Sequence, residues 1–161
     1  MRNYALLLSL ALVGQAFPGT HRIPEDEPIA TVRIPDDWKV EAHGECVEGV
    51  TAKGAVHVLI MPVEGSKVAE SMGEAMRYIR RTGTVVVKAD SLKRDTTTVK
   101  EKHLQIVSWD ATDKAVPFQI RCHILSPSEG NQLLVVFWAP IEAGKKYQSQ
   151  LDGILESVAA P

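Results

Sequence analysis

The sequence Leu133-Leu-Val-Val-Phe-Trp138 decides how this chain folds. Successive side chains of a β-strand point to opposite faces of the sheet, so an unbroken apolar run places apolar groups on both faces. Strands of this kind lie in the centre of sheets that are covered on both sides. The sequence therefore predicts a central strand over residues 132–139, with other elements packed on each face.

The segments before this strand also have the two-residue period and the β-branched residues of strands. Short turn-forming stretches separate them, which favours antiparallel neighbours. The expected strands are residues 85–87, 103–109 and 116–125, with turns at 110–113 and 126–130. Residues 90–102 carry threonines among charged residues and give no clear assignment.

A hairpin is expected over residues 45–62, because Lys53-Gly54 at its middle supplies the positive φ of a tight turn. This register pairs Val50 with His57 and Cys46 with Met61. It also separates two sets of side chains. The face expected in the core carries Val47, Val56, Val58 and Ile60, and the other carries His57, Leu59 and Met61.

Two segments have the apolar spacing of amphipathic helices. The first is residues 66–81, with Ser66 as the N-cap and an apolar stripe of Val68, Met72, Ala75, Met76 and Ile79. The second is residues 144–158, with a stripe of Tyr147, Leu151, Ile154, Leu155 and Val158. This order of elements predicts an α+β domain: a mostly antiparallel sheet of about six or seven strands with helices packed on it.

A turn motif, Ile34-Pro-Asp-Asp-Trp38, follows a predicted strand at 29–34 and places Trp38 to fold back over the core. Together with the hairpin, the mid-chain helix, the strand run and a final helix ending Ile154-Leu-Glu-Ser-Val158, this layout resembles PsbP-like domains over about residues 28–159. That fold is shared by photosystem extrinsic subunits, a nuclear import factor that binds Ran, and small bacterial envelope proteins. The resemblance implies an α/β/α sandwich and a binding or accessory role, and it transfers no functional residues.

The first residues have the order of a signal peptide: Arg2, an apolar run over 4–13, and the small residues Gly14 and Ala16 at a cleavage site. We expect a signal peptide at 1–16, an N-terminal tether at 17–28 and a single α+β domain at 29–160. The alternative is a buried N-terminal helix. The run is shorter than the roughly 20 residues of a membrane span, so we expect a periplasmic or secreted mature chain without a transmembrane segment.

Export permits disulfides, so Cys46 and Cys122 are a possible disulfide pair. Closing so long a loop would stabilise the fold by about 4 kcal/mol in the chain-entropy picture. The alternative is two separately buried thiols.

The formal charge of −2, with basic and acidic residues intermixed, argues against nucleic acid as a partner. The sequence has neither a Gly-x-Ser-x-Gly motif, nor paired metal-ligand spacing, nor a glycine-rich phosphate loop. Cys122 and His123 are adjacent in a strand, so they point to opposite faces and do not form a dyad. We therefore predict no catalytic, cofactor-binding or metal-binding residue.

One weaker candidate is a surface cluster of His57, His103 and His123, with Trp109 lining a groove, if the strand order puts all of them on one face. The alternative is that these are separate, half-exposed strand residues. The sequence favours an exported, non-enzymatic cell-envelope accessory or binding protein whose protein or small-molecule partner is unknown. The other readings are an enzyme assembled from these dispersed histidines, or a carrier of an apolar small molecule.

Overall fold

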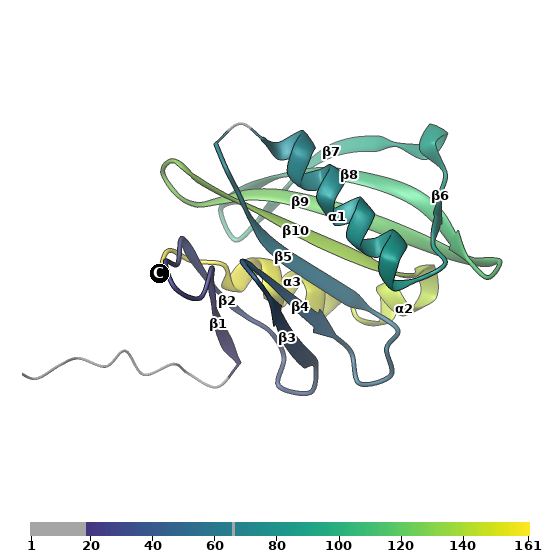
Figure 1. Cartoon of the computed structure of the whole chain (residues 1–161), viewed down its shortest axis with the longest axis horizontal. Coiled ribbons are helices and arrows are strands. Elements are labelled where there is room, and N and C mark those ends of the chain that lie inside the picture. Colours follow the sequence, from purple (N-terminus) through teal and green to yellow (C-terminus); the bar gives the residue numbers. More distant parts are fainter. Residues whose placement is uncertain (1–18, 66) are drawn as a thin grey trace, which may run out of the picture.

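A computed structural model describes residues 19–65 and 67–161 of the chain. Its main sheet has eight strands in the order β3-β4-β5-β10-β9-β8-β6, with β7 also paired to β8, and every pairing is antiparallel (Figure 1). A separate ribbon of two strands, β1 and β2, lies beside it. The predicted antiparallel α+β architecture is confirmed.

The elements have the following bounds. The strands are β1 (Thr20–Ile23), β2 (Ala30–Arg33), β3 (Lys39–His43), β4 (Cys46–Val50), β5 (His57–Val63), β6 (Val86–Val87), β7 (Lys93–Val99), β8 (Lys102–Asp113), β9 (Val116–Ser128) and β10 (Asn131–Pro140). The helices are α1 (Val68–Thr82), the short 3-10 helix η1 (Ala89–Ser91), α2 (Ile141–Lys146) and α3 (Gln148–Ser157).

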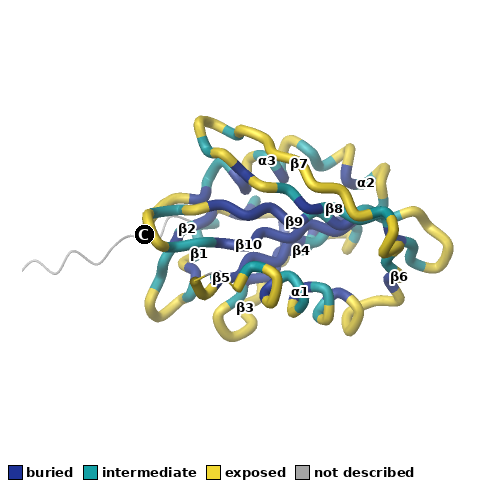
Figure 2. Tube along the Cα trace, turned by 90° about the horizontal axis from the view of Figure 1, so that it is seen from above, coloured by how far each residue is buried: buried dark blue, intermediate teal, exposed yellow. Residues whose placement is uncertain are grey.

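Strand β10 is the central strand that its sequence predicts. It pairs with β5 on one side and β9 on the other, and every residue from Leu133 to Ala139 is buried. The burial decreases from these central strands toward the exposed edge strand β7 (Figure 2). Apolar side chains on both faces of β10 therefore require a covering layer on each side.

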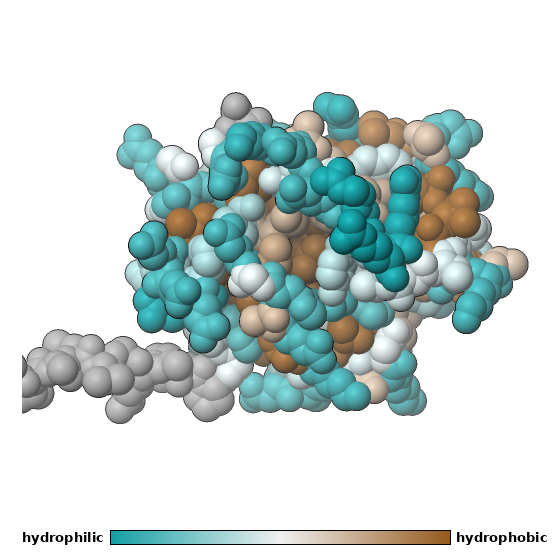
Figure 3. Space-filling model, viewed as in Figure 1, coloured by the Kyte–Doolittle hydropathy of each residue, from teal (hydrophilic) through white to brown (hydrophobic). Residues whose placement is uncertain are grey.

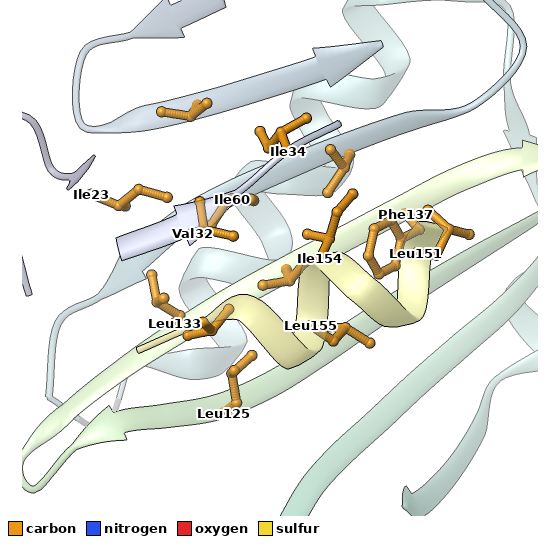
Figure 4. Packing of buried hydrophobic residues seen from close by; sticks show 14 of the residues in the cluster. Ile23, Val32, Ile34, Ile60, Leu125, Leu133, Phe137, Leu151, Ile154 and Leu155 are labelled. Atoms are coloured by element: carbon orange, nitrogen blue, oxygen red, sulfur yellow. The ribbon is translucent and has the colours of Figure 1, made fainter. Parts of the chain in front are cut away.

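Helix α3 covers one face of the sheet. Its buried residues Leu151, Ile154 and Leu155 belong to the same apolar cluster as Leu133 and Phe137 of β10 (Figure 4). The opposite face packs against α1, whose Ala75 and Ile79 are fully buried against the side chains that point the other way from β5, β9 and β10. The structure is thus an α/β/α sandwich, as predicted.

The β4–β5 hairpin keeps the predicted register, with Val50 opposite His57, although the ladder ends at Val47 opposite Ile60, before the expected Cys46–Met61 pair. Its connection is longer than a two-residue turn. The Thr51 hydroxyl accepts hydrogen bonds from the backbone N–H groups of Ala55 and Val56. Both faces of the hairpin are buried, because α1 covers the side that carries Leu59 and Met61.

Both helices differ from their predicted bounds. Helix α1 begins at Val68 with Lys67 at the N-cap position, and the predicted cap, Ser66, lies outside the described residues. The predicted C-terminal helix is two helices, α2 and α3, which meet at Tyr147. The break lets α2 leave β10 directly at Ile141 while α3 turns its own apolar stripe onto the sheet.

The N-terminal segment departs from the predicted tether. Residues 20–23 form β1, which pairs with β2, and Ile23 is fully buried. The predicted signal peptide lies outside the described residues. Among residues 19–65 and 67–161, no helix is long and apolar enough to cross a membrane.

Candidate functional site

The most developed candidate site is a cavity of about 370 Å³ between α1 and the strands β3, β4 and β5. Its floor is apolar and consists of Leu59 and Met61 of β5 with Ala75 of α1. In the space-filling view, apolar side chains lie at the bottom of a hollow on this face, surrounded by hydrophilic ones (Figure 3). A cavity of this size is within the range of small-molecule binding sites.

One wall of the cavity is held by the buried carboxylate of Glu48. Glu48 is only 9% exposed, because β4 directs it beneath α1 beside Leu59, its partner across the hairpin. The Tyr78 hydroxyl donates a hydrogen bond of 2.5 Å to its Oε2 atom. Nδ1 of His57 lies 3.2 Å from Oε1, and Nε2 of His43 lies 3.5 Å from Oε2. A buried charge needs such partners, so these four side chains form one polar unit, the Glu48 network.

Two members of the Glu48 network, His57 and Tyr78, pack against the indole ring of Trp138. The imidazole of His57 stacks on Trp138 of β10, with ring centroids 4.8 Å apart and planes 14° apart. Tyr78 approaches the same indole edge-on, at 6.4 Å between centroids. These contacts fix the orientation of His57 and Tyr78 before any ligand enters.

The two weakly acidic groups of the cavity are held in their neutral forms. Burial and the hydrogen bond to Glu48 raise the pKa of the Tyr78 phenol above its usual value. Burial, followed by the neighbouring carboxylates of Glu45 and Glu74, raises the pKa of the Cys46 thiol. Since the thiolate is the nucleophilic form of cysteine, the Cys46 environment opposes covalent chemistry at this thiol.

The rim of the cavity carries charge on successive turns of α1. Arg77 and Arg81 both line it, and Arg77 lies 3.8 Å from the carboxylate of Glu74. Arg81 has no ion pair within the part of the chain that the structure describes. Glu74 lines the same rim and offsets Arg77, so Arg81 is the rim cation that has no ion pair among the described residues.

The predicted histidine cluster does not assemble. His57 is on the α1 side of the sheet, whereas His123 is on the α3 side, where it meets Phe137 edge-on at 5.2 Å between centroids. His103 is exposed and lies 3.2 Å from the Thr98 hydroxyl on the edge strand β7. Alternation along the strands, together with the strand order, separates these three histidines.

Trp109 lies on the same face of the sheet as His57 but three strands away from it. It is half-buried on the α1 side of β8 and lies in the cross-strand row that runs through Ile120 and Trp138 to His57. It packs into the core cluster there and does not line the α1 cavity.

The suggested disulfide is not formed. Cys46 and Cys122 are both free, on β4 and β9, with β5 and β10 between them. Three strand spacings of about 4.8 Å place the two backbones roughly 14 Å apart, well beyond the reach of a disulfide. Within the described residues, no group of three or more His, Cys, Asp and Glu side chains is arranged to hold a metal ion.

Sequence reasoning missed Glu48, Tyr78 and His43. The hairpin register alone places Glu48 opposite Leu59, so a carboxylate on a face shared with apolar residues was a readable signal. The hydrogen-bond partners of Glu48 could not be predicted from the sequence, because Tyr78 reaches Glu48 only when α1 packs on the sheet in one particular rotation about its axis.

Comparison with known proteins shows the fold. No protein-family model and no curated protein sequence matches this chain. Among solved structures, cyanobacterial PsbP from Synechocystis is similar at a TM-score of 0.59 and 7% identity, over 92% of this chain and 96% of that one. A crystal structure from Bacteroides thetaiotaomicron matches at a TM-score of 0.56 and 10% identity, over 83% of this chain, which spans only 45% of that protein. LpqN of Mycobacterium tuberculosis, described as involved in cell envelope biogenesis, aligns at a TM-score of 0.48 and 11% identity, over 88% of this chain and 91% of that one. The chain therefore has a PsbP-like fold.

Proposed function

We propose that this chain is an exported accessory protein of the cell envelope that acts by binding, and that its ligand site is the α1 cavity. The observation that carries the proposal is the cavity itself, an apolar floor of Leu59, Met61 and Ala75 beneath a charged rim. An enclosed apolar surface with a few polar groups at its edge is the usual design of a small-molecule site.

The polar groups of the site support binding over catalysis. The carboxylate of Glu48 already contacts Tyr78, His57 and His43, so its role is to hold the side chains of the cavity wall in place. The raised pKa values of Cys46 and Tyr78 keep the thiol and the phenol protonated at neutral pH. A wall whose polar groups are already hydrogen-bonded to one another favours a binding role without turnover.

The export part of the proposal rests on the sequence of residues 1–16, which has the charged, apolar and small-residue order of a leader. Cleavage after Ala16 would release a periplasmic or secreted chain whose described part begins with the β1–β2 ribbon.

The charges at the rim define the ligand class. Arg81, which has no ion pair among the described residues, stands at the mouth of a cavity whose floor is apolar, so the ligand combines an apolar body with an anionic group. The apolar body displaces water from the floor and the anion meets the rim arginines.

The test is a fluorescence titration of the purified chain with 1-anilinonaphthalene-8-sulfonate, which has an aromatic body and one sulfonate. We expect a saturable binding phase whose affinity falls about tenfold in Arg81→Glu, since reversing a charge beside the anion costs on the order of 1.4 kcal/mol. Arg80→Glu is the matched control, because it makes the same change on the next residue of α1, outside the cavity. Non-saturable binding, or equal effects of the two variants, would overturn the proposal.

A further inference from the structure

A second cavity, of about 300 Å³, lies on the opposite side of the sheet beneath α2 and α3. The side chain of Arg121 enters it from β9, and the apolar part of its lining comes from Phe137 of β10, Ile141 of α2 and Leu151 of α3. It is separate from the α1 cavity, since the whole thickness of the sheet lies between them.

Arg121 is a half-buried cation without a carboxylate in direct contact. Its Nη2 atom donates a 3.0 Å hydrogen bond to Oε1 of Gln148, and Nε2 of Gln148 donates in turn to Oδ1 of Asp152 at 2.7 Å. Within the described residues, no Asp or Glu oxygen lies within 4.0 Å of its guanidinium. Burial lowers the pKa of Arg121, and the more distant Asp152 only partly opposes this.

This arrangement leaves hydrogen-bonding capacity of the guanidinium unused by other side chains. A guanidinium carries five N–H donors in a planar fork, and one hydrogen bond to a side chain accounts for only part of them. The remaining donors of this half-buried guanidinium face the cavity, where an anionic ligand would pair with them. A carboxylate matches the fork in two parallel hydrogen bonds.

The rest of the lining selects among anions. Phe137, Ile141 and Leu151 offer apolar contact next to the guanidinium, which an inorganic ion would leave unused. The amide side chains of Gln119 and Gln148 add neutral hydrogen-bonding groups, and Lys145 stands at the mouth, paired at 2.7 Å with Glu142.

We propose that the cavity beneath α2 and α3 binds a small organic carboxylate with a short apolar body, with the carboxylate on Arg121 and the body against Phe137, Ile141 and Leu151. This site is independent of the ligand site assigned to the α1 cavity, and either can fail without the other.

Isothermal titration of the chain with hexanoate, hexanamide and inorganic phosphate tests the proposal. Hexanoate should show a saturable binding phase that depends on Arg121, and in that phase both hexanamide and phosphate should bind at least about tenfold more weakly, because the first lacks the charge and the second the apolar body. Equal affinity for hexanoate and hexanamide, or tighter binding of phosphate, would overturn it.

Substitutions at Arg121, with two control variants elsewhere, locate the site. Arg121→Met keeps the length of the side chain and removes the fork, and it should reduce hexanoate affinity at least about tenfold. Arg94→Met makes the same change on the exposed strand β7 and should leave the affinity unchanged. Arg121→Lys keeps the charge but lacks the planar fork, so its affinity for hexanoate should fall several-fold. This variant gives a second readout if Arg121→Met folds poorly. Arg81→Glu at the other cavity should leave the hexanoate binding phase that depends on Arg121 unchanged. Undiminished hexanoate binding by both Arg121 variants would contradict the assignment.

Discussion

The hydroxyl of Tyr78 on α1 donates a 2.5 Å hydrogen bond to Oε2 of Glu48 on β4. The two residues come from different layers of the sandwich, so this bond fixes the position of the helix over the end of the sheet. It also satisfies a carboxylate that is 9% exposed. The wall of the α1 cavity and the packing of α1 thus depend on the same contact.

Replacing Tyr78 with Phe should destabilise the protein by about 1–3 kcal/mol, because a buried carboxylate then loses its shortest hydrogen bond. Urea unfolding measures the change. In Glu48→Gln the carboxylate is absent, so adding Tyr78→Phe to that variant should cost less than it does in the unchanged chain. Strict additivity of the two substitutions would show that the contact contributes nothing.

Acid should destabilise the fold through His123. Burial, with a smaller contribution from Arg121, lowers the pKa of His123 to about 4, and its Nδ1 atom has no hydrogen-bond partner. The unfolded chain, with a pKa near 6.5, binds more protons than the folded chain between these two values. Stability should therefore fall by up to about 3 kcal/mol as the pH drops from about 6.5 to 4.

The matched measurement for His123 is the pH dependence of the free energy of unfolding in His123→Leu. This variant should lose distinctly less stability than the unchanged chain over the same pH range. Identical slopes in the two proteins would mean that His123 does not contribute.

Two glycines should respond to alanine in opposite directions. A Cβ atom on Gly49 of β4 would lie 2.9 Å from Cγ1 of Val58 and 3.2 Å from Cγ2 of Ile34, so Gly49→Ala should cost about 1–3 kcal/mol by overpacking. Gly153 of α3 has open space at the same position, so Gly153→Ala should stabilise by about 0.5–1 kcal/mol. Thermal unfolding of the two variants compares them, and destabilisation by both would contradict the packing described.

The cysteines should titrate as two free thiols after purification without reductant. In denaturant, Ellman's reagent should detect both Cys46 and Cys122. In the folded protein Cys122 should react very slowly, because it is buried and burial raises its pKa to about 12. Detection of no thiol in denaturant would instead show that both cysteines are oxidised, contrary to the structure.

Much of the fold follows from local patterns. The apolar run at Leu133–Trp138 specifies a central strand, and the centre of the hairpin at Lys53-Gly54 specifies the pairing of Val50 with His57. Both predictions rest on the fixed two-residue alternation of side chains in a strand, so they can be made without knowledge of the tertiary structure.

The features that sequence reasoning missed have few local signals. The hairpin turns at Lys100-Glu101 and Lys114-Ala115 have positive φ without any glycine or asparagine, so β7 was unassigned and β8 was predicted to end at Trp109, four residues early. Similarly, nothing in the helical stripe of 144–158 marks the break at Tyr147, where the path is set by packing on the sheet.

The site was less accessible to prediction than the fold. The strand order separates His57, His103 and His123, and that order is a property of the whole sheet. The contact between Glu48 and Tyr78 depends on how α1 is rotated about its axis over β4 and β5. The apolar stripe of the helix determines this rotation only approximately.

The most direct test of ligand binding in the α1 cavity is an NMR titration of the chain labelled with ¹³C at its methionine methyl groups. Met61 lies on the floor of this cavity, so its methyl signal should shift and saturate as 1-anilinonaphthalene-8-sulfonate is added, and Arg81→Glu should need more of the compound for the same shift. A Met61 signal that stays unchanged while the compound binds would contradict the account.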